Sequence, residues 1–122
     1  MNLVTNLTPL LLVETSDGIG LDGVLPQELT HLSTLEMLQM SSNHDIQGNL
    51  PEGISRLSNL EHIAVSRNQL TGSIPSELCD MTNLRHIFLG FNEFEGNIPS
   101  CIDGLRKLET LFVSSVKLQQ WQ

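Results

Sequence analysis

A phrase that recurs about every 24 residues constrains this chain more than any other feature. The phrase is Gly-x-Leu/Ile-Pro, and the prolines of its copies are Pro26, Pro51, Pro75 and Pro99. A second phrase, Leu-x-x-Leu-x-Leu-x-x-Asn, runs between them and is clearest over residues 60–68 and 84–92. A fixed period of this length is typical of a solenoid, in which each repeat forms one coil stacked on the next. A solenoid offers a long exposed face rather than one enclosed pocket, so the repeat favours binding.

Acidic residues outnumber basic ones, with 14 Asp and Glu against 6 Lys and Arg and a formal net charge of −8. The first basic residue is Arg56, so residues 1–55 contain no Lys or Arg. A surface this acidic repels nucleic-acid phosphates and anionic lipid headgroups. No run reaches the roughly 18 apolar residues that a membrane span needs. We therefore expect no nucleic-acid partner, and no membrane contact by this segment itself.

The residues of one repeat predict the path of its coil. Leu60, Ile63 and Val65 alternate with polar positions, as expected of a short half-buried strand. Leu78 and Met81 then recur at a spacing of three, which favours a short helical or 3₁₀ arc. Stacking would align the strands into one parallel sheet, with the arcs on the opposite side.

The domain prediction follows from these coils. We expect a single domain over residues 1–122, of about four to five coils. The coils are a degenerate first coil 7–31, then 32–56, 57–80 and 81–104, and an incomplete last coil 105–122.

The full repeat resembles the plant-type leucine-rich repeat, Leu-x-x-Leu-x-x-Leu-x-Leu-x-x-Asn-x-Leu-x-Gly-x-Ile-Pro. Residues 57–99 match almost every position, and a weaker match covers nearly the whole chain. The resemblance implies a right-handed superhelix, or horseshoe, with a parallel β-sheet on its concave face and short helical or 3₁₀ arcs on its convex face. Relatives of this type include ectodomains of receptor-like kinases, receptor-like proteins and secreted inhibitors of cell-wall-degrading enzymes.

The function that the resemblance implies is recognition of a protein or peptide ligand by a piece of a receptor-like or secreted protein. One alternative is that these coils are a scaffold within a longer solenoid and bind nothing. Another is the ectodomain of a receptor-like serine/threonine kinase whose kinase domain lies outside this sequence. The residues suggest no catalytic set and no cofactor, so we expect no enzyme. The resemblance places the protein at the cell surface or in a secreted form.

Outward positions of the predicted strands supply the candidate ligand site. Phe88 and Phe112 occupy equivalent positions in successive coils, and Phe91 follows beside them. Exposed aromatic clusters mark interaction sites. The structural alternative is that these rings pack on neighbouring coils. The predicted site on the concave face comprises His62, Arg67, His86, Phe88, Phe91 and Phe112.

The basic members of this predicted site have alternatives of their own. His62 and His86 would stack as neighbours, either as solvated imidazoles or as a weak metal or acid-sensing pair. Arg67 would offer an exposed fork to a ligand carboxylate or to an acid of its own surface. Phe94, in contrast, takes an apolar position of the repeat and should be core.

Other polar residues are assigned structural or unproven roles. Asn43, Asn68 and Asn92 should form a structural ladder at the bend, because an amide can satisfy backbone groups of two coils. Asn6 lies in an Asn-x-Thr sequence and is a candidate glycosylation site. Cys79 and Cys101 are expected as two free thiols, with a disulfide as the alternative and no metal site.

The two ends of the chain lack the paired cysteines that often cap relatives. Apolar coil edges would then be exposed, and edge-to-edge self-association is expected if no further coils cover them. A fragment, a truncated gene model and a short protein that needs a partner are the three interpretations of these ends.

Overall fold

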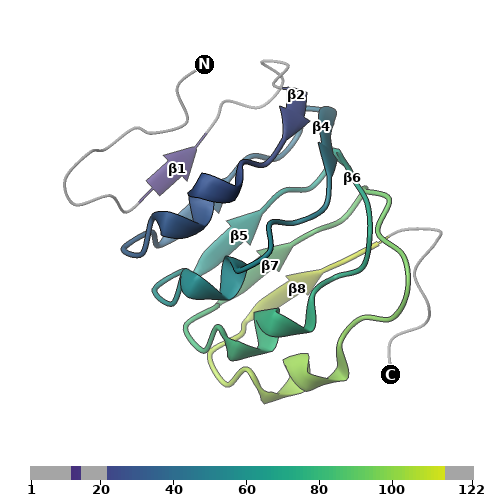
Figure 1. Ribbon diagram of the computed structural model, residues 1–122. Helices are drawn as coiled ribbons and strands as arrows, with labels where there is room; N and C mark the ends of the chain where they lie inside the picture. Colours follow the sequence, from purple (N-terminus) through teal and green to yellow (C-terminus); the bar gives the residue numbers. More distant parts are fainter. Residues whose placement is uncertain (1–11, 15–21, 115–122) are drawn as a thin grey trace.

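Five short parallel strands form the larger of two sheets in a computed structural model, which describes residues 12–14 and 22–114. The strands are β1 (Leu12–Glu14), β3 (Met37–Gln39), β5 (His62–Ala64), β7 (His86–Phe88) and β8 (Thr110–Phe112). Neighbouring strands belong to successive coils, as Figure 1 shows. The repeat thus builds the predicted leucine-rich-repeat solenoid, one strand of this sheet per coil.

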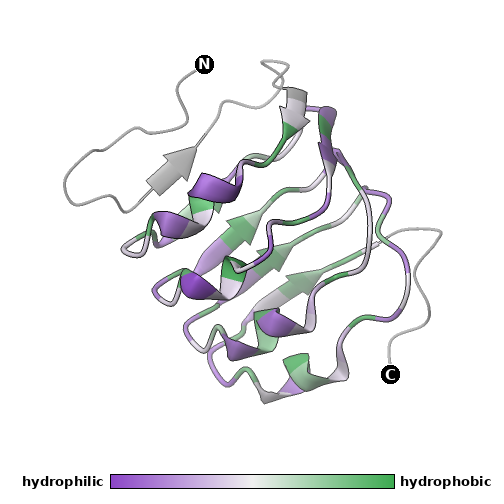
Figure 2. Cartoon of the chain, viewed as in Figure 1, coloured by the Kyte–Doolittle hydropathy of each residue, from purple (hydrophilic) through white to green (hydrophobic). Residues whose placement is uncertain are grey.

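On the convex side, the described residues form four 3₁₀ helices, which stack along the molecule. They are η1 (Gln27–His31), η2 (Ile54–Arg56), η3 (Ser76–Asp80) and η4 (Ser100–Gly104). Three of them begin directly after the proline of the repeated phrase, whose fixed φ suits entry into a helical turn. Figure 2 shows hydrophilic and hydrophobic segments alternating along these arcs. Within the described residues, no helix combines the length and hydropathy that crossing a membrane requires.

A smaller sheet lies along a third side of the stack (Figure 1) and was not predicted. Its strands are β2 (Asp22–Val24), β4 (Asp45–Gly48) and β6 (Gln69–Leu70), and an isolated bridge between Ser73 and Glu95 extends it by one coil. The apolar positions Ile46 and Leu70 are buried beside exposed neighbours, which is the alternation of a half-buried strand. Two apolar-polar steps per repeat were too few to identify these strands from the sequence.

Aliphatic columns fill the interior, because each strand places equivalent residues one above another. Leu38 pairs with Ile63, and Ile63 pairs with Ile87, and all three side chains are fully buried. Phe94 is fully buried as predicted. Burying each such side chain stabilises the fold by about 1.5–3 kcal/mol, which no single coil could achieve alone.

Buried asparagines cross-link successive coils at the bend that follows each strand of the larger sheet. Asn68 donates from Nδ2 to the carbonyl of Met40 in the preceding coil (3.0 Å) and to Val65 in its own (3.1 Å). Asn92 repeats this arrangement on Val65 (2.9 Å), and its Oδ1 accepts from the Leu70 amide (3.0 Å). Each asparagine therefore satisfies backbone groups that the bend would otherwise leave unpaired.

The third residue of this ladder, Asn43, is buried and donates to the Met40 carbonyl at 3.0 Å. The bend after it contains an additional residue, and His44 there adopts a left-handed backbone (φ 72°). In the coil above, the Oδ1 of Asn68 has no hydrogen-bond partner among the described residues. The longer bend thus coincides with the weakest step of the ladder.

The glycine of the repeated phrase is required by the backbone, and Gly72 illustrates why. Its φ is +81°, a region that side-chain-bearing residues rarely adopt. A Cβ at this position would lie 2.5 Å from the Oδ1 of Asn49 in the preceding coil. The turn therefore needs both the left-handed conformation and the missing side chain.

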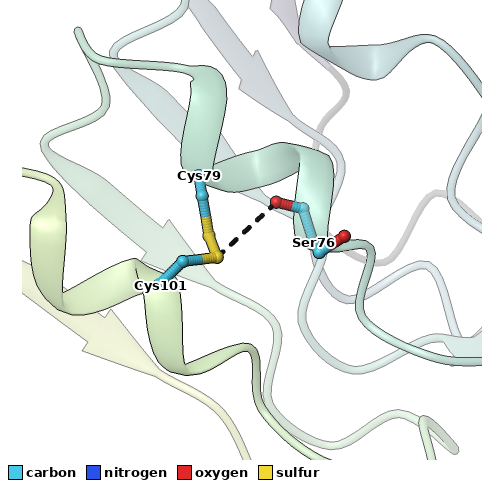
Figure 3. The surroundings of a disulfide bond; sticks show 3 residues. All are labelled: Ser76, Cys79 and Cys101. Carbon is cyan, nitrogen blue, oxygen red and sulfur yellow. Dashed lines mark hydrogen bonds between the residues drawn. A yellow bond between two sulfur atoms is a disulfide. The ribbon is translucent and has the colours of Figure 1, made fainter.

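Cys79 and Cys101 form a disulfide between η3 and η4 (Figure 3), so the expectation of two free thiols is wrong. Their Cα atoms are 5.8 Å apart, and the Sγ of Cys101 lies 3.8 Å from the carbonyl oxygen of Ser76. Cys79 is the fourth residue of its arc and Cys101 the second of the next. Positions two apart on a turn of about three residues point in different directions. The Cys79 side chain points toward the next coil and the Cys101 side chain points back toward η3, as Figure 3 shows. The bond forms for this reason, although the two residues differ in repeat position.

Candidate functional site

The candidate site lies on the concave face, which we define by the outward side chains of the larger sheet and of the bends that follow its strands. The strand register places His62 beside His86, and His86 beside Thr110. The same register places Ala64 beside Phe88, and Phe88 beside Phe112. The concave cluster, named for its six predicted members, is His62, Arg67, His86, Phe88, Phe91 and Phe112.

An exposed aromatic pair dominates one part of this cluster. Phe91 and Phe112 are 52% and 41% exposed, and their ring centroids are 5.7 Å apart in a tilted arrangement. The guanidinium carbon of Arg67 lies 4.4 Å from the Phe91 ring centroid, a cation–π contact. Two apolar rings and one cation are thus presented together to solvent.

The bend geometry explains why Arg67 and Phe91 meet. Both residues adopt left-handed backbones, with φ of 58° and 57°, directly before the ladder asparagines Asn68 and Asn92. The Arg67 amide donates to the Gly90 carbonyl (3.0 Å), so equivalent bends of neighbouring coils are held in register. The structural asparagines therefore fix the positions of two residues of the candidate site.

Gly90 is a residue of this site that sequence reasoning missed. A Cβ on Gly90 would lie 2.2 Å from the Cε2 atom of Phe112, so the ring occupies the space of the absent side chain. The equivalent residues of neighbouring coils are Ser66 and Ser114, and this change within a column is the signal that could have identified Gly90. The space left by Gly90 holds the Phe112 ring toward Phe91, although the strand register pairs Phe112 with Phe88.

The second part of the cluster consists of two imidazoles and the ring of Phe88. The His62 centroid lies 5.7 Å from that of His86 and 5.6 Å from that of Phe88, and the His86 and Phe88 rings stack at 6.3 Å. These three side chains are half-buried rather than fully exposed. Phe88 is thus less available as an anchor than the outward position predicted, because the histidines surround it.

Ala64 and His62 show how closely this part of the face is packed. Ala64 points outward in the register but is buried, so its position contributes no ligand contact. The Nε2 of His62 is also buried and has no partner among the described residues. Burial lowers the pKa of His62 below its ordinary value of 6.5, and the neighbouring His86 lowers that pKa further. The face therefore favours a neutral His62.

Other candidate sites gain little from the geometry. Asn6 lies outside the described residues, so its glycosylation stays a prediction. Over residues 12–14 and 22–114, no group of three or more His, Cys, Asp or Glu side chains could hold a metal ion. A polar hollow of about 340 Å³ beside the strands is bordered by Arg85 and Glu109, which are joined in an exposed ion pair. Exposed pairs of this kind contribute little to stability.

The Leucine Rich Repeat family model matches residues 59–81 and 83–105. Among solved structures, the BIR2 ectodomain from Arabidopsis thaliana is similar, with 29% identity and a TM-score of 0.84 over 92% of this chain and 58% of that one. The fold and these matches define a plant-type leucine-rich repeat protein. The chain is similar to leucine-rich-repeat ectodomains of plant receptor kinases.

Two further structures extend the comparison. The Arabidopsis thaliana receptor kinase GASSHO1/SCHENGEN3, solved with CASPARIAN STRIP INTEGRITY FACTOR 2, has 39% identity and a TM-score of 0.75 over 84% of this chain and 12% of that one. A plant ice-binding protein has 27% identity and a TM-score of 0.75 over 85% of this chain and 33% of that one. The chain thus spans between 12% and 58% of the length of these three proteins. No curated protein sequence matches the chain.

Proposed function

We propose that this chain is a protein- or peptide-binding leucine-rich-repeat domain that engages its ligand through the concave cluster. The observation that carries the proposal is the exposed pair of Phe91 and Phe112, with Arg67 stacked on one ring. Aromatic side chains and arginine are the residue types that most often anchor protein interfaces. Rings held by Gly90 and Arg67 need little further ordering on binding, which favours affinity.

The similar structures support a protein or peptide partner without identifying one. GASSHO1/SCHENGEN3 was solved in complex with CASPARIAN STRIP INTEGRITY FACTOR 2, and another similar structure is the BIR3–SERK2 complex. The plant ice-binding protein has the same fold, so the fold alone does not choose the ligand. The choice of a protein or peptide ligand therefore rests on the side chains of the concave cluster.

We further propose that the domain acts outside the cell, at the surface or in secreted form, as a piece of a receptor-like or secreted binding protein. The disulfide between Cys79 and Cys101 supports this setting, since such bonds persist in oxidising compartments. The similar proteins include receptor ectodomains, which supports the same setting. Recognition without catalysis is the role that this fold typically fulfils.

Selection of displayed random peptides against the full chain tests the proposal. The binding of enriched peptides to purified variants is then measured by biolayer interferometry. Phe91→Ala and Phe112→Ala should each weaken binding by roughly thirtyfold, because each removes an anchor. Val24→Ala is the matched control, since Val24 is an exposed apolar residue of the smaller sheet. Peptides that bind both Phe variants as tightly as the wild-type chain would show that the site lies elsewhere.

A further inference from the structure

From β3 to β8, the concave face contains no carboxylate, in contrast to the rest of the chain. The outward residues of this stretch are Met37, Gln39, Ser41, Ser42, His62, Ala64, Ser66, Arg67, His86, Phe88, Gly90, Phe91, Thr110, Phe112 and Ser114. None of these is acidic, although the chain has 14 Asp and Glu residues and a net charge of −8. Most of the acidic charge therefore lies outside this stretch of the face.

The nearest acidic residues lie at the edges of this face. Glu36, Glu61 and Glu109 directly precede strands β3, β5 and β8. Glu109 is paired with Arg85, with 2.5 Å between Oε2 and NH2. Glu14 of β1 pairs in register with Gln39, at the opposite end of the sheet from β7 and β8.

Arg67 supplies the face with an exposed guanidinium, whose N–H groups form a rigid fork of donors. Among the described residues, no carboxylate lies within ion-pair distance of it. Its guanidinium instead rests on the Phe91 ring, 4.4 Å from the centroid. A guanidinium can stack on a ring by its flat side and still offer an N–H edge to a ligand. That edge suits two parallel hydrogen bonds to a carboxylate.

We propose that the concave face binds an acidic peptide segment, a deepening that rests on the proposed function. An apolar or aromatic side chain of the peptide packs on Phe91 and Phe112, and a neighbouring Asp or Glu side chain pairs with Arg67. The two ring centroids are 5.7 Å apart and Arg67 lies on one of them, so adjacent peptide residues can reach both.

This specificity is opposite to the one that net charge predicts. A chain with a charge of −8 attracts basic peptides at long range, but that attraction is screened beyond about 10 Å at ordinary salt. At contact, a Lys or Arg of the ligand would meet Arg67 as a like charge, with no acid on the stretch of the face from β3 to β8 to offset it. An acidic side chain of the ligand would accept hydrogen bonds from the Arg67 guanidinium. The preference therefore includes both an attractive and a repulsive element.

The test uses random linear peptides displayed without a free carboxyl terminus, selected on the full chain at moderate salt. Enriched peptides should combine Asp or Glu with an adjacent aromatic or aliphatic residue. One such peptide and its Asn or Gln copy are then synthesised with amidated ends and titrated against wild type, Arg67→Gln and the control Arg106→Gln. Arg106 is an exposed arginine that precedes β8 and lies outside the face.

Removing the peptide carboxylate should weaken binding to the wild type and to Arg106→Gln by about tenfold or more, and should change binding to Arg67→Gln little. That coupling supports the inference. Peptides that need Phe91 but show no acidic preference, or no coupling to Arg67, overturn the inference and leave the proposed function intact. Enriched peptides that ignore both Phe91 and Phe112 overturn the proposed function together with the inference.

Discussion

The side chains beneath the larger sheet and those above it follow different rules. Beneath it, Leu38, Ile63 and Ile87 form a column of nearly uniform aliphatic residues. Above it, the neighbouring column changes from Gln39 to a buried Ala64 and then to aromatic Phe88 and Phe112. The inner column holds the stacked coils together. The outer column contributes less to stacking, so its residue types are free to vary. Stability and recognition should therefore respond to different substitutions.

The largest effect on folding is expected from the inner column. Ile87→Ala removes a fully buried side chain and should lower the free energy of unfolding by about 2–5 kcal/mol, measured by chemical denaturation. Phe112→Ala, on the outer side of the sheet, should change it by less than about 1 kcal/mol. Equal losses for the two variants would contradict the separation between the columns.

The disulfide on the convex side offers a second way to separate stability from binding. A crosslink that spans 22 residues restricts the unfolded chain, so the double variant Cys79→Ala, Cys101→Ala should lose about 3 kcal/mol of stability. Peptide binding should not change under conditions where the variant stays folded, because η3 and η4 lie away from the concave face. Calorimetry and a binding titration on the same sample check both statements.

The asparagine ladder offers a comparison between two equivalent residues. Asn92 uses both ends of its amide, whereas the Oδ1 of Asn68 lacks a partner among the described residues. Asn92→Ala should therefore destabilise the fold by about 1–3 kcal/mol, and Asn68→Ala should have a smaller effect. The reverse order in denaturant unfolding would show that the longer bend after Asn43 does not weaken the ladder.

The smallest effect concerns pH. Because the folded-state pKa of His62 lies below its ordinary value of 6.5, the unfolded chain binds the proton more readily. Stability should be constant above the unfolded-state pKa, should fall as the pH drops through 6.5, and should level off below the folded-state pKa. Melting temperatures between about pH 7.5 and 5 should show this loss reduced in His62→Gln. The variant His31→Gln, at an exposed residue of η1, should retain the wild-type slope.

Much of the fold could be predicted from the sequence because the repeat expresses it directly. The spacing of Leu60, Ile63 and Val65 fixes the inward side of a strand, and the proline of each copy marks the start of an arc. The smaller sheet escaped prediction because its strands are too short to show a period. The disulfide escaped prediction because Cys79 and Cys101 occupy different positions on their arcs, and the spacing does not tell which way each side chain points.

The candidate site was predictable only in part, since a repeat assigns positions and not side-chain conformations. The column shared by Phe88 and Phe112 follows from the register. The turn of the Phe112 ring toward Phe91 depends on the absence of a side chain at Gly90. The contact of Arg67 with a ring rather than with an acid depends on the left-handed backbone of the bend. The residue types at the bend do not predict this conformation.

A matched pair of glycine substitutions tests most directly whether Phe91 and Phe112 form the binding site. In Gly90→Ala the new Cβ must displace the Phe112 ring, whereas a Cβ at Gly104 meets open space. Binding of a selected peptide to both variants is measured alongside their unfolding. We expect Gly90→Ala to bind about tenfold more weakly with stability within about 1 kcal/mol of wild type, and Gly104→Ala to match the wild type in both. Unchanged binding by Gly90→Ala would contradict the assignment of Phe91 and Phe112 as the ligand site.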